Sequence, residues 1–202
     1  MRPRITPDEA QKLWNDYQSG DMYALANIMQ GYYPDLFHWG LRLHGEREFV
    51  KDCIQDMFVN LWKMQQSAGA AHAGAVHTGA AHTGAVSNVR SYLLVALKTR
   101  ILRELSKKHV THQSMLSDEY SFSVEFSSDL RLIDEEHEIY QVRKLEGVLN
   151  NLSGRQKELI YLRFYQSLSF EQIAEVMNLS RQSVYNLLQK SLGSLRKHYH
   201  LS

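Results

Sequence analysis

The feature that most narrowly limits the fold of this chain is a pair of helix starts near its C-terminus. Ser169 and Gln172 have the S-x-x-Q spacing of a capping box, which satisfies the first backbone N–H groups of a helix. Asn178 tolerates the left-handed conformation of a tight turn, and Ser180 can cap the helix that follows. The spacing predicts a short helix over 170–177, a turn, and a longer helix over 181–198.

Short helix, tight turn and capped long helix together have the arrangement of a helix-turn-helix. Small Ala174 sits where the two helices must approach closely, and Val176 would pack against Val184. Arg suits guanine in the major groove, Asn and Gln suit adenine, and Lys suits phosphates, so we expect DNA binding rather than a plain hairpin of two helices. The side chains expected on the outer face of the second helix are Arg181, Gln182, Ser183, Tyr185, Asn186, Gln189 and Lys190.

Helical periodicity dominates the rest of the chain, and no stretch shows convincing strand alternation. Pro34 should kink or split its helix, because proline lacks a backbone N–H. The apolar stripes of two helices include Tyr23 and Trp62, which are therefore expected in the core. The expected helices begin at Pro7, Asp21, Glu46 and Val89, and the last three end near Leu43, Met64 and Lys108. We expect an all-α protein.

Charge is distributed unevenly, although the net charge is only +1. Residues 88–108 carry six basic side chains and one acidic one, and residues 139–202 carry nine basic and four acidic ones. The stretch 109–138 carries one basic and eight acidic side chains. Two basic blocks around an acidic connector suit a protein that contacts a polyanion at two points, although basic helix faces also occur without a ligand.

Composition divides the chain into two small helical domains. Residues 1–108 form the first domain and include a low-complexity loop insertion at 66–87. Residues 109–137 are acidic and Ser-rich with scattered aromatics such as Phe122, so we expect a flexible linker without a core of its own. Residues 138–202 form the second domain, which contains the helix-turn-helix.

Several protein classes are disfavoured. Cys53 is the only cysteine, so an internal disulfide is impossible and a reducing cytoplasmic setting is expected. No signal-peptide core and no apolar stretch long enough to insert into a membrane is recognisable. The histidines are scattered, and neither an H-E-x-x-H motif nor a Gly-rich phosphate loop occurs. We therefore expect a protein that is not an enzyme and needs no cofactor.

The stretch from Leu149 to Arg196, above all LSFEQIAEVMNLSRQSVYNLLQKSLGSLRK, resembles region 4 of the bacterial sigma-70 family. The first half is similar to region 2 of that family. There GDMYALANIMQGYYPDLFHWG resembles the opening helices, FVKDCIQDMFVNLWKM the helix that holds the polymerase clamp, and VRSYLLVALKTRILRELSKK the helix that faces melted promoter DNA. Two regions with a short linker are the layout of the extracytoplasmic-function (group 4) type. The resemblance covers nearly everything except the insertion and most of the linker.

The resemblance implies a sigma factor, which binds core RNA polymerase and directs it to promoters in transcription initiation. It also implies an anti-sigma partner. The residues that would dock on the polymerase clamp are Asp52, Gln55, Asp56 and Phe58, with Leu61 and Trp62 supporting the helix from the core. A solvated helix face is the simpler explanation of the acids. A helix-turn-helix regulator that binds DNA without polymerase remains the alternative, although the sequence shows no obvious dimerisation or sensor domain.

The resemblance to the sigma-70 family also implies that the basic helix that begins near Asn88 meets the −10 element and that region 4 reads the −35 element. The residues expected to hold −10 phosphates are Arg90, Lys98, Arg100 and Arg103. The family often has Asn near Lys98 and Asp near Arg103, so its −10 base contacts are not carried over to this chain. Tyr92 is expected in the core rather than as a platform for an unstacked base.

An Ala/Gly/His repeat lies between the clamp-binding helix and the promoter-facing helix. Its histidines, His72, His77 and His82, stand five residues apart. This spacing places them on different faces of a helix or a strand, so no metal site is predicted. We expect a tolerated loop expansion, because each doubling of loop length costs only about 0.6 kcal/mol of closure entropy.

Deleting Ala68–Val86 is expected to preserve the fold and to change −10 selectivity. The resemblance implies that the loop at this place helps to capture a flipped −10 base, and here the loop has grown by roughly four pentapeptides. Transcription from a set of −10 variants, with and without the deletion, measures the effect. Unchanged selectivity in the deletion variant would contradict the expectation.

Overall fold

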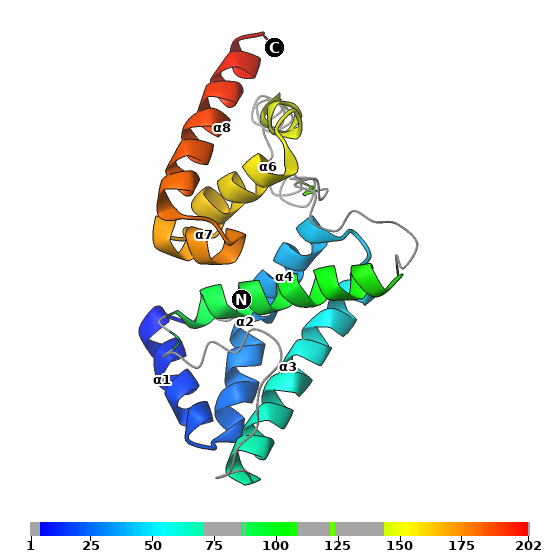
Figure 1. Ribbon diagram of the computed structural model, residues 1–202, viewed down its shortest axis with the longest axis vertical. Coiled ribbons are helices and arrows are strands. Elements are labelled where there is room, and N and C mark those ends of the chain that lie inside the picture. Colours follow the sequence, from blue (N-terminus) through cyan, green and yellow to red (C-terminus); the bar gives the residue numbers. More distant parts are fainter. Residues whose placement is uncertain (1–4, 71–85, 87, 109–121, 124–143, 202) are drawn as a thin grey trace, which may run out of the picture. The chain divides into compact units, whose positions relative to one another are not determined.

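The computed structural model describes residues 5–70, 86, 88–108, 122–123 and 144–201, of which 67–70, 108, 198, 200 and 201 by backbone only (Figure 1). Every secondary-structure element in these ranges is a helix, so the predicted all-α fold is confirmed. The chain divides into two compact units: unit 1 comprises Met1–Leu41 and Glu46–Lys108, and unit 2 comprises Arg42–Gly45 and His109–Ser202. Most of the repeat and nearly all of the predicted linker lie outside the described residues.

Unit 1 is built mainly from four helices. They are α1 (Pro7–Gln18), α2 (Met22–Leu43), α3 (Arg47–Ala70) and α4 (Val89–Lys108). The start of α1 is a capping box: Thr6 Oγ1 accepts the Glu9 N–H at 3.3 Å, and the Glu9 carboxylate accepts the Thr6 N–H at 2.9 Å. The bounds of α4 agree with the sequence prediction, whereas α3 continues beyond the predicted end at Met64.

The core of unit 1 lies where α4 packs against α1 and α3 (Figure 1). Burying a large apolar side chain contributes about 1.5–3 kcal/mol, so this cluster is the main source of stability in the unit. Tyr17 of α1 also links α1 to α3, because its hydroxyl donates a hydrogen bond to the Leu61 carbonyl at 2.7 Å. Burial raises the pKa of Tyr17 to about 12. The largest fully buried side chains here are Ile28, Leu36, Trp39, Ile54, Leu93, Leu94, Leu97 and Ile101.

Three expectations for unit 1 are corrected by the structure. Helix α2 runs unbroken through Pro34, so the predicted split is wrong. A proline removes one helical hydrogen bond, and the buried side chains of Tyr32 and Leu36 on either side hold the helix against the core. Tyr23 is 84% exposed and Trp62 is 43% exposed, so neither belongs to the core.

Gly40 of α2 lies against Val50 of α3. A Cβ at this position would stand 2.5 Å from Val50 Cγ1 and 3.6 Å from Leu97 Cδ2. Gly193 in α8 (Arg181–Leu201) offers the opposite case, since a Cβ there would meet nothing within 4 Å. Both glycines lie in helices, but only Gly40 is crowded, so Gly193 is a control for the effect of an added methyl group at Gly40.

Gly40→Ala is expected to destabilise unit 1 by about 1–3 kcal/mol, because overpacking outweighs the better helix propensity of alanine. Gly193→Ala is expected to stabilise unit 2 by about 0.5–1 kcal/mol, because only the propensity changes. Urea unfolding of both variants measures the difference. Equal stabilisation by the two substitutions would contradict the close approach at Gly40.

Unit 2 contains α6 (Gly154–Ile160), the π-helical turn η2 (Tyr161–Tyr165), α7 (Phe170–Met177) and α8. Residues 144–150 are also helical. Both α6 and α7 pack against α8 (Figure 1). The core residues include Val148, Leu149, Leu152, Leu159, Leu162, Leu168, Ile173, Val176 and Val184. A capping box starts α6: the Ser153 hydroxyl accepts the Gln156 N–H, and the Gln156 side chain accepts the Ser153 N–H at 3.0 Å.

Phe122 is one of the two described residues within the predicted linker. It is 1% exposed, and its ring centroid lies 5.6 Å from that of Tyr161. The linker was expected to have no core of its own, and this one aromatic side chain packs on the core of unit 2, because an aromatic side chain that reaches an apolar surface gains by burial there. Among the described helices, none combines the length and the apolar character that crossing a membrane requires.

Candidate functional site

The helix-turn-helix in unit 2 is assembled by side-chain caps and one left-handed residue. Ser169 Oγ accepts the Gln172 N–H at 3.3 Å, and Gln172 Oε1 accepts the Ser169 N–H at 2.7 Å. Asn178 ends α7 with φ 52° and ψ 52°, the left-handed conformation that the sequence predicted. Ser180 Oγ then accepts the Ser183 N–H at 3.1 Å and starts α8. These local contacts fix the angle at which α8 leaves the turn.

Packing of α7 against α8 decides which side of α8 faces outward. Ile173 and Val176 of α7 and Val184 of α8 are buried between the helices. The opposite side of α8 is exposed at all seven positions singled out in the sequence, from Arg181 to Lys190. We call this surface, made of Arg181, Gln182, Ser183, Tyr185, Asn186, Gln189 and Lys190, the recognition face.

Two side-chain contacts organise the polar part of the recognition face. Gln182 Nε2 donates to Asn186 Oδ1 at 3.1 Å, one helical turn apart, and so orients the Asn186 amide. The hydroxyl of Ser183 lies 2.8 Å from that of Ser180. Gln182 and Asn186 both carry donor and acceptor groups of the kind that pairs with adenine in a major groove.

Arg181 is held by residues of α7. Its guanidinium forms an ion pair with Glu171 at 2.9 Å and lies 5.9 Å from the centroid of the Tyr185 ring. That ring packs on Phe170, with 4.3 Å between the centroids. The sequence reasoning missed Glu171, because nothing in the sequence shows that its exposed carboxylate faces the start of the next helix.

In unit 1, α3 presents an exposed face that contains three of the four predicted docking residues. Asp52, Gln55 and Asp56 are exposed on neighbouring turns. Phe58 is only 5% exposed, so its predicted role as a surface anchor is wrong. The buried face of α3 is wide enough to include it, together with Ile54, Met57 and Leu61. The exposed apolar side chains of this part of α3 are Val59, Trp62 and Met64.

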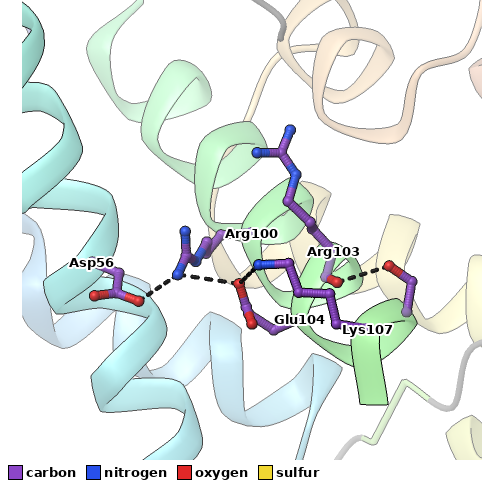
Figure 2. Close-up of polar contacts among 6 residues, drawn as sticks. Asp56, Arg100, Arg103, Glu104 and Lys107 are labelled. Carbon is purple, nitrogen blue, oxygen red and sulfur yellow. Dashed lines mark hydrogen bonds and ion pairs between the residues drawn. The ribbon is translucent and has the colours of Figure 1, made fainter. Parts of the chain in front are cut away.

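Arg90 and Arg100, which were predicted to bind phosphates, form ion pairs within unit 1. Arg90 donates to Asp35 of α2 at 2.8 Å, and the two side chains are 22% and 16% exposed. Arg100 pairs with Asp56 of α3 and, at 3.1 Å, with Glu104 of its own helix (Figure 2). These arginines therefore help to hold α4 on the other helices.

The remaining two predicted residues of α4 have different surroundings. Lys98 is half-buried and Arg103 is exposed. Figure 2 shows the Arg103 side chain extending away from the Asp56–Arg100–Glu104 contacts. Tyr92 is half-buried with its ring centroid 5.0 Å from that of Trp14, and burial raises the pKa of its hydroxyl. Tyr92 therefore packs at the edge of the core rather than inside it.

Arg90→Ala is expected to destabilise unit 1 by about 1–3 kcal/mol, because it leaves the largely buried Asp35 carboxylate without its guanidinium. Arg103→Ala, on the same helix but exposed, is expected to change the free energy of unfolding by less than about 0.5 kcal/mol. Urea unfolding measures both. Similar values for the two variants would show that the Asp35–Arg90 pair has no structural role.

No three His, Cys, Asp or Glu side chains in the described ranges are arranged to hold a metal ion. The repeat histidines lie outside those ranges. Cys53 is buried in unit 1, and burial raises the pKa of its thiol to about 11.

Comparison with known proteins agrees with this picture. Residues 148–197 match the protein family described as "Sigma-70, region 4", whereas no curated protein matches the sequence. The structure of CnrH in complex with the cytosolic domain of CnrY is similar with a TM-score of 0.55 at 16% identity, over 93% of this chain and 95% of that one. The sigma factor RpoE in complex with the anti-sigma factor NepR from Bartonella quintana is similar with a TM-score of 0.50 at 16% identity, over 88% of this chain and 97% of that one.

The two structural similarities concern the fold, and they extend over both units. The family match covers α6, α7 and most of α8, the elements that form the helix-turn-helix and its recognition face. The helical fold in two units also agrees with the all-α, two-domain architecture that the sequence predicts. By sequence, residues 148–197 thus match the family of sigma-70 region 4 domains.

Proposed function

We propose that this protein is a sigma factor that binds core RNA polymerase and directs it to promoters. The observation that carries the proposal is the capped helix-turn-helix inside the region 4 match, with seven exposed side chains on one face of α8. Sigma factors initiate transcription without catalysing a reaction themselves. In keeping with the RpoE–NepR complex, we propose an anti-sigma protein as a further partner.

Region 4 would read the −35 element through the recognition face. Helix α8 would enter the major groove with its first turns, as recognition helices do. Arg181, Gln182 and Asn186 have the chemistry for base edges, while Lys190 suits a phosphate. Glu171 would hold the Arg181 guanidinium in place before DNA arrives, which lowers the entropy cost of binding.

Region 2 would contact the −10 element through α4. Arg103 is exposed, whereas Arg90, Lys98 and Arg100 are half-buried, so Arg103 is the most accessible phosphate ligand of the four. Arg90 and Arg100 would add to the positive field of the helix while stabilising unit 1 through their ion pairs. The proposed −10 surface is thus centred on the second half of α4.

Polymerase would dock on the exposed face of α3. Asp52, Gln55 and Asp56 provide the polar contacts, and Val59 and Trp62 provide exposed apolar area beside them. An apolar anchor flanked by polar groups is typical of the residues that dominate protein interfaces. Trp62 therefore takes the place that the sequence reasoning gave to Phe58.

The division into domains follows from the same assignment. We propose that residues 1–108 act as region 2, that residues 138–202 act as region 4, and that residues 109–137 connect them. Phe122, buried against Tyr161, would hold one part of the connecting segment on unit 2. Because α3 extends to Ala70, the part of the predicted insertion beyond Ala70 would lie between the polymerase-binding helix α3 and the promoter-facing helix α4.

The test is transcription by core polymerase supplemented with the full chain on a library of promoter fragments. We expect the chain to co-purify with core polymerase and to direct initiation from a subset of fragments that share −10 and −35 sequences. Binding to DNA without binding to core polymerase would instead identify a stand-alone helix-turn-helix regulator.

A further inference from the structure

One charge network joins two surfaces of unit 1 that have different proposed ligands (Figure 2). Asp56 lies on the α3 face proposed to meet polymerase. Arg100 lies on α4, the helix proposed to meet promoter DNA, and its guanidinium donates to the Asp56 carboxylate. The same two charges are therefore opposite partners within the folded unit and candidate ligands for two different macromolecules.

The exposure of these side chains suggests which partner can be exchanged. Arg100 is 22% exposed, whereas Asp56 is 52% exposed and so accessible to a third charged group. Arg100 also contacts Glu104 at 3.1 Å within α4, and Glu104 contacts Lys107 at 3.0 Å. If Asp56 turned to another cation, Arg100 would still have a carboxylate beside it, which keeps the cost of opening the Asp56–Arg100 pair small.

Competition then works in both directions. A basic group of polymerase that binds Asp56 must displace Arg100, and a DNA phosphate that binds Arg100 must displace Asp56. Whichever ligand binds first breaks the Asp56–Arg100 ion pair, so the second ligand binds without the free-energy cost of breaking it. By thermodynamic linkage, each ligand raises the affinity for the other by the same factor. An accessible ion pair corresponds to a factor of about five.

We propose that the Asp56–Arg100 ion pair couples polymerase docking to promoter binding: it restrains both residues in the unbound chain and opens when either ligand binds. This inference rests on the proposed function. It assigns Asp56 and Arg100 a role that neither the helix-turn-helix nor the family match supplies, and it makes Glu104 the residue that retains Arg100 when the pair opens.

The first test measures the affinity of the full chain for core RNA polymerase. Arg100→Gln is expected to tighten core binding about fivefold, because Asp56 is released from its internal partner. Lys12→Gln makes the same charge change at an exposed position of α1 and is expected to leave core affinity unchanged. Unchanged or weakened binding by Arg100→Gln, with wild-type stability by thermal unfolding, would overturn the coupling.

The second test starts from Asp56 and uses no polymerase. The probe is a fork-junction DNA of generic sequence, because phosphate contacts do not depend on sequence. Asp56→Asn is expected to bind it about fivefold more tightly, and the slope of log affinity against log salt should steepen by about one phosphate contact. The gain should vanish in the Asp56→Asn/Arg100→Gln double variant. A gain that persists without Arg100 would reflect net charge alone and overturn the proposal.

The two tests separate this inference from the proposed function. Failure of the wild-type chain to bind core polymerase would refute the proposed function, and the DNA measurements would still decide whether Asp56 restrains Arg100. Core binding by the wild-type chain, without tightening by Arg100→Gln and without a DNA gain by Asp56→Asn, would leave the sigma assignment intact and refute the coupling.

Discussion

Asp56→Arg is expected to lower the affinity of the chain for core RNA polymerase by about a hundredfold or more. Reversing a charge in a docking surface replaces an attraction by a repulsion, and truncation of buried interface charges already costs about 2–5 kcal/mol. The introduced guanidinium would also stand beside Arg100, which loses its partner on α3. Co-purification of the variant with core polymerase, followed by a titration, measures the effect.

The control for this experiment is Asp8→Arg, which makes the same charge change in the first turn of α1, outside the proposed docking face. It should bind core polymerase as the wild-type chain does. Because Asp56→Arg also disturbs unit 1, its thermal unfolding and the DNA binding of unit 2 have to be checked alongside. A folded Asp56→Arg variant that still binds core polymerase would exclude docking through this face of α3.

Asn186→Ala and Lys190→Ala are expected to weaken promoter recognition in two different ways. Removing a bidentate base contact costs about 1–3 kcal/mol, a factor of roughly 5–150, at the base that Asn186 reads, and relaxes the preference at that position. Removing a phosphate contact by Lys190→Ala weakens binding to all sequences alike and reduces the salt dependence by about one counterion. Selection from a randomised −35 library by the holoenzyme distinguishes these outcomes.

Gln182→Ala is expected to have an effect of the same kind as Asn186→Ala but smaller. Its amide donates to Asn186 Oδ1, so its loss should partly reproduce the Asn186→Ala phenotype even at bases that Gln182 does not contact. If Lys190→Ala altered base preference while Asn186→Ala lowered affinity uniformly, the proposed roles along α8 would be reversed. Unchanged selection by all three variants would place −35 recognition elsewhere.

The exposed outer side of α8 could be predicted because the signals that define it are local. The capping box at Ser169, the left-handed residue Asn178 and the cap at Ser180 each act within one helical turn, so the sequence contains both partners of every contact. Once the turn is fixed, Val184 must face α7, and the polar side chains of α8 face outward. The predicted bounds of α4 and α7 also agree with the structure.

The faces of the long helices in unit 1 were decided by tertiary structure. Periodicity shows that α3 has an apolar stripe, but it does not show how wide a strip of the helix the neighbours cover. Phe58 proved to be covered and Trp62 to be exposed, although both lie on the edges of the same apolar pattern. For the same reason the spacing of Tyr23 placed it in the core, whereas the neighbouring helices leave it exposed.

Ion pairs between residues far apart in the chain could not be predicted from the sequence either. Arg90 meets Asp35 across 55 residues, and Arg100 meets Asp56 across 44. The sequence determined the helices, their caps and the polar recognition face, since these depend on neighbours within a turn. Only the packing of α4 on α2 and α3 decided which arginines of α4 are held by carboxylates, because an ion pair needs two side chains within a few ångströms and chain order does not set that distance.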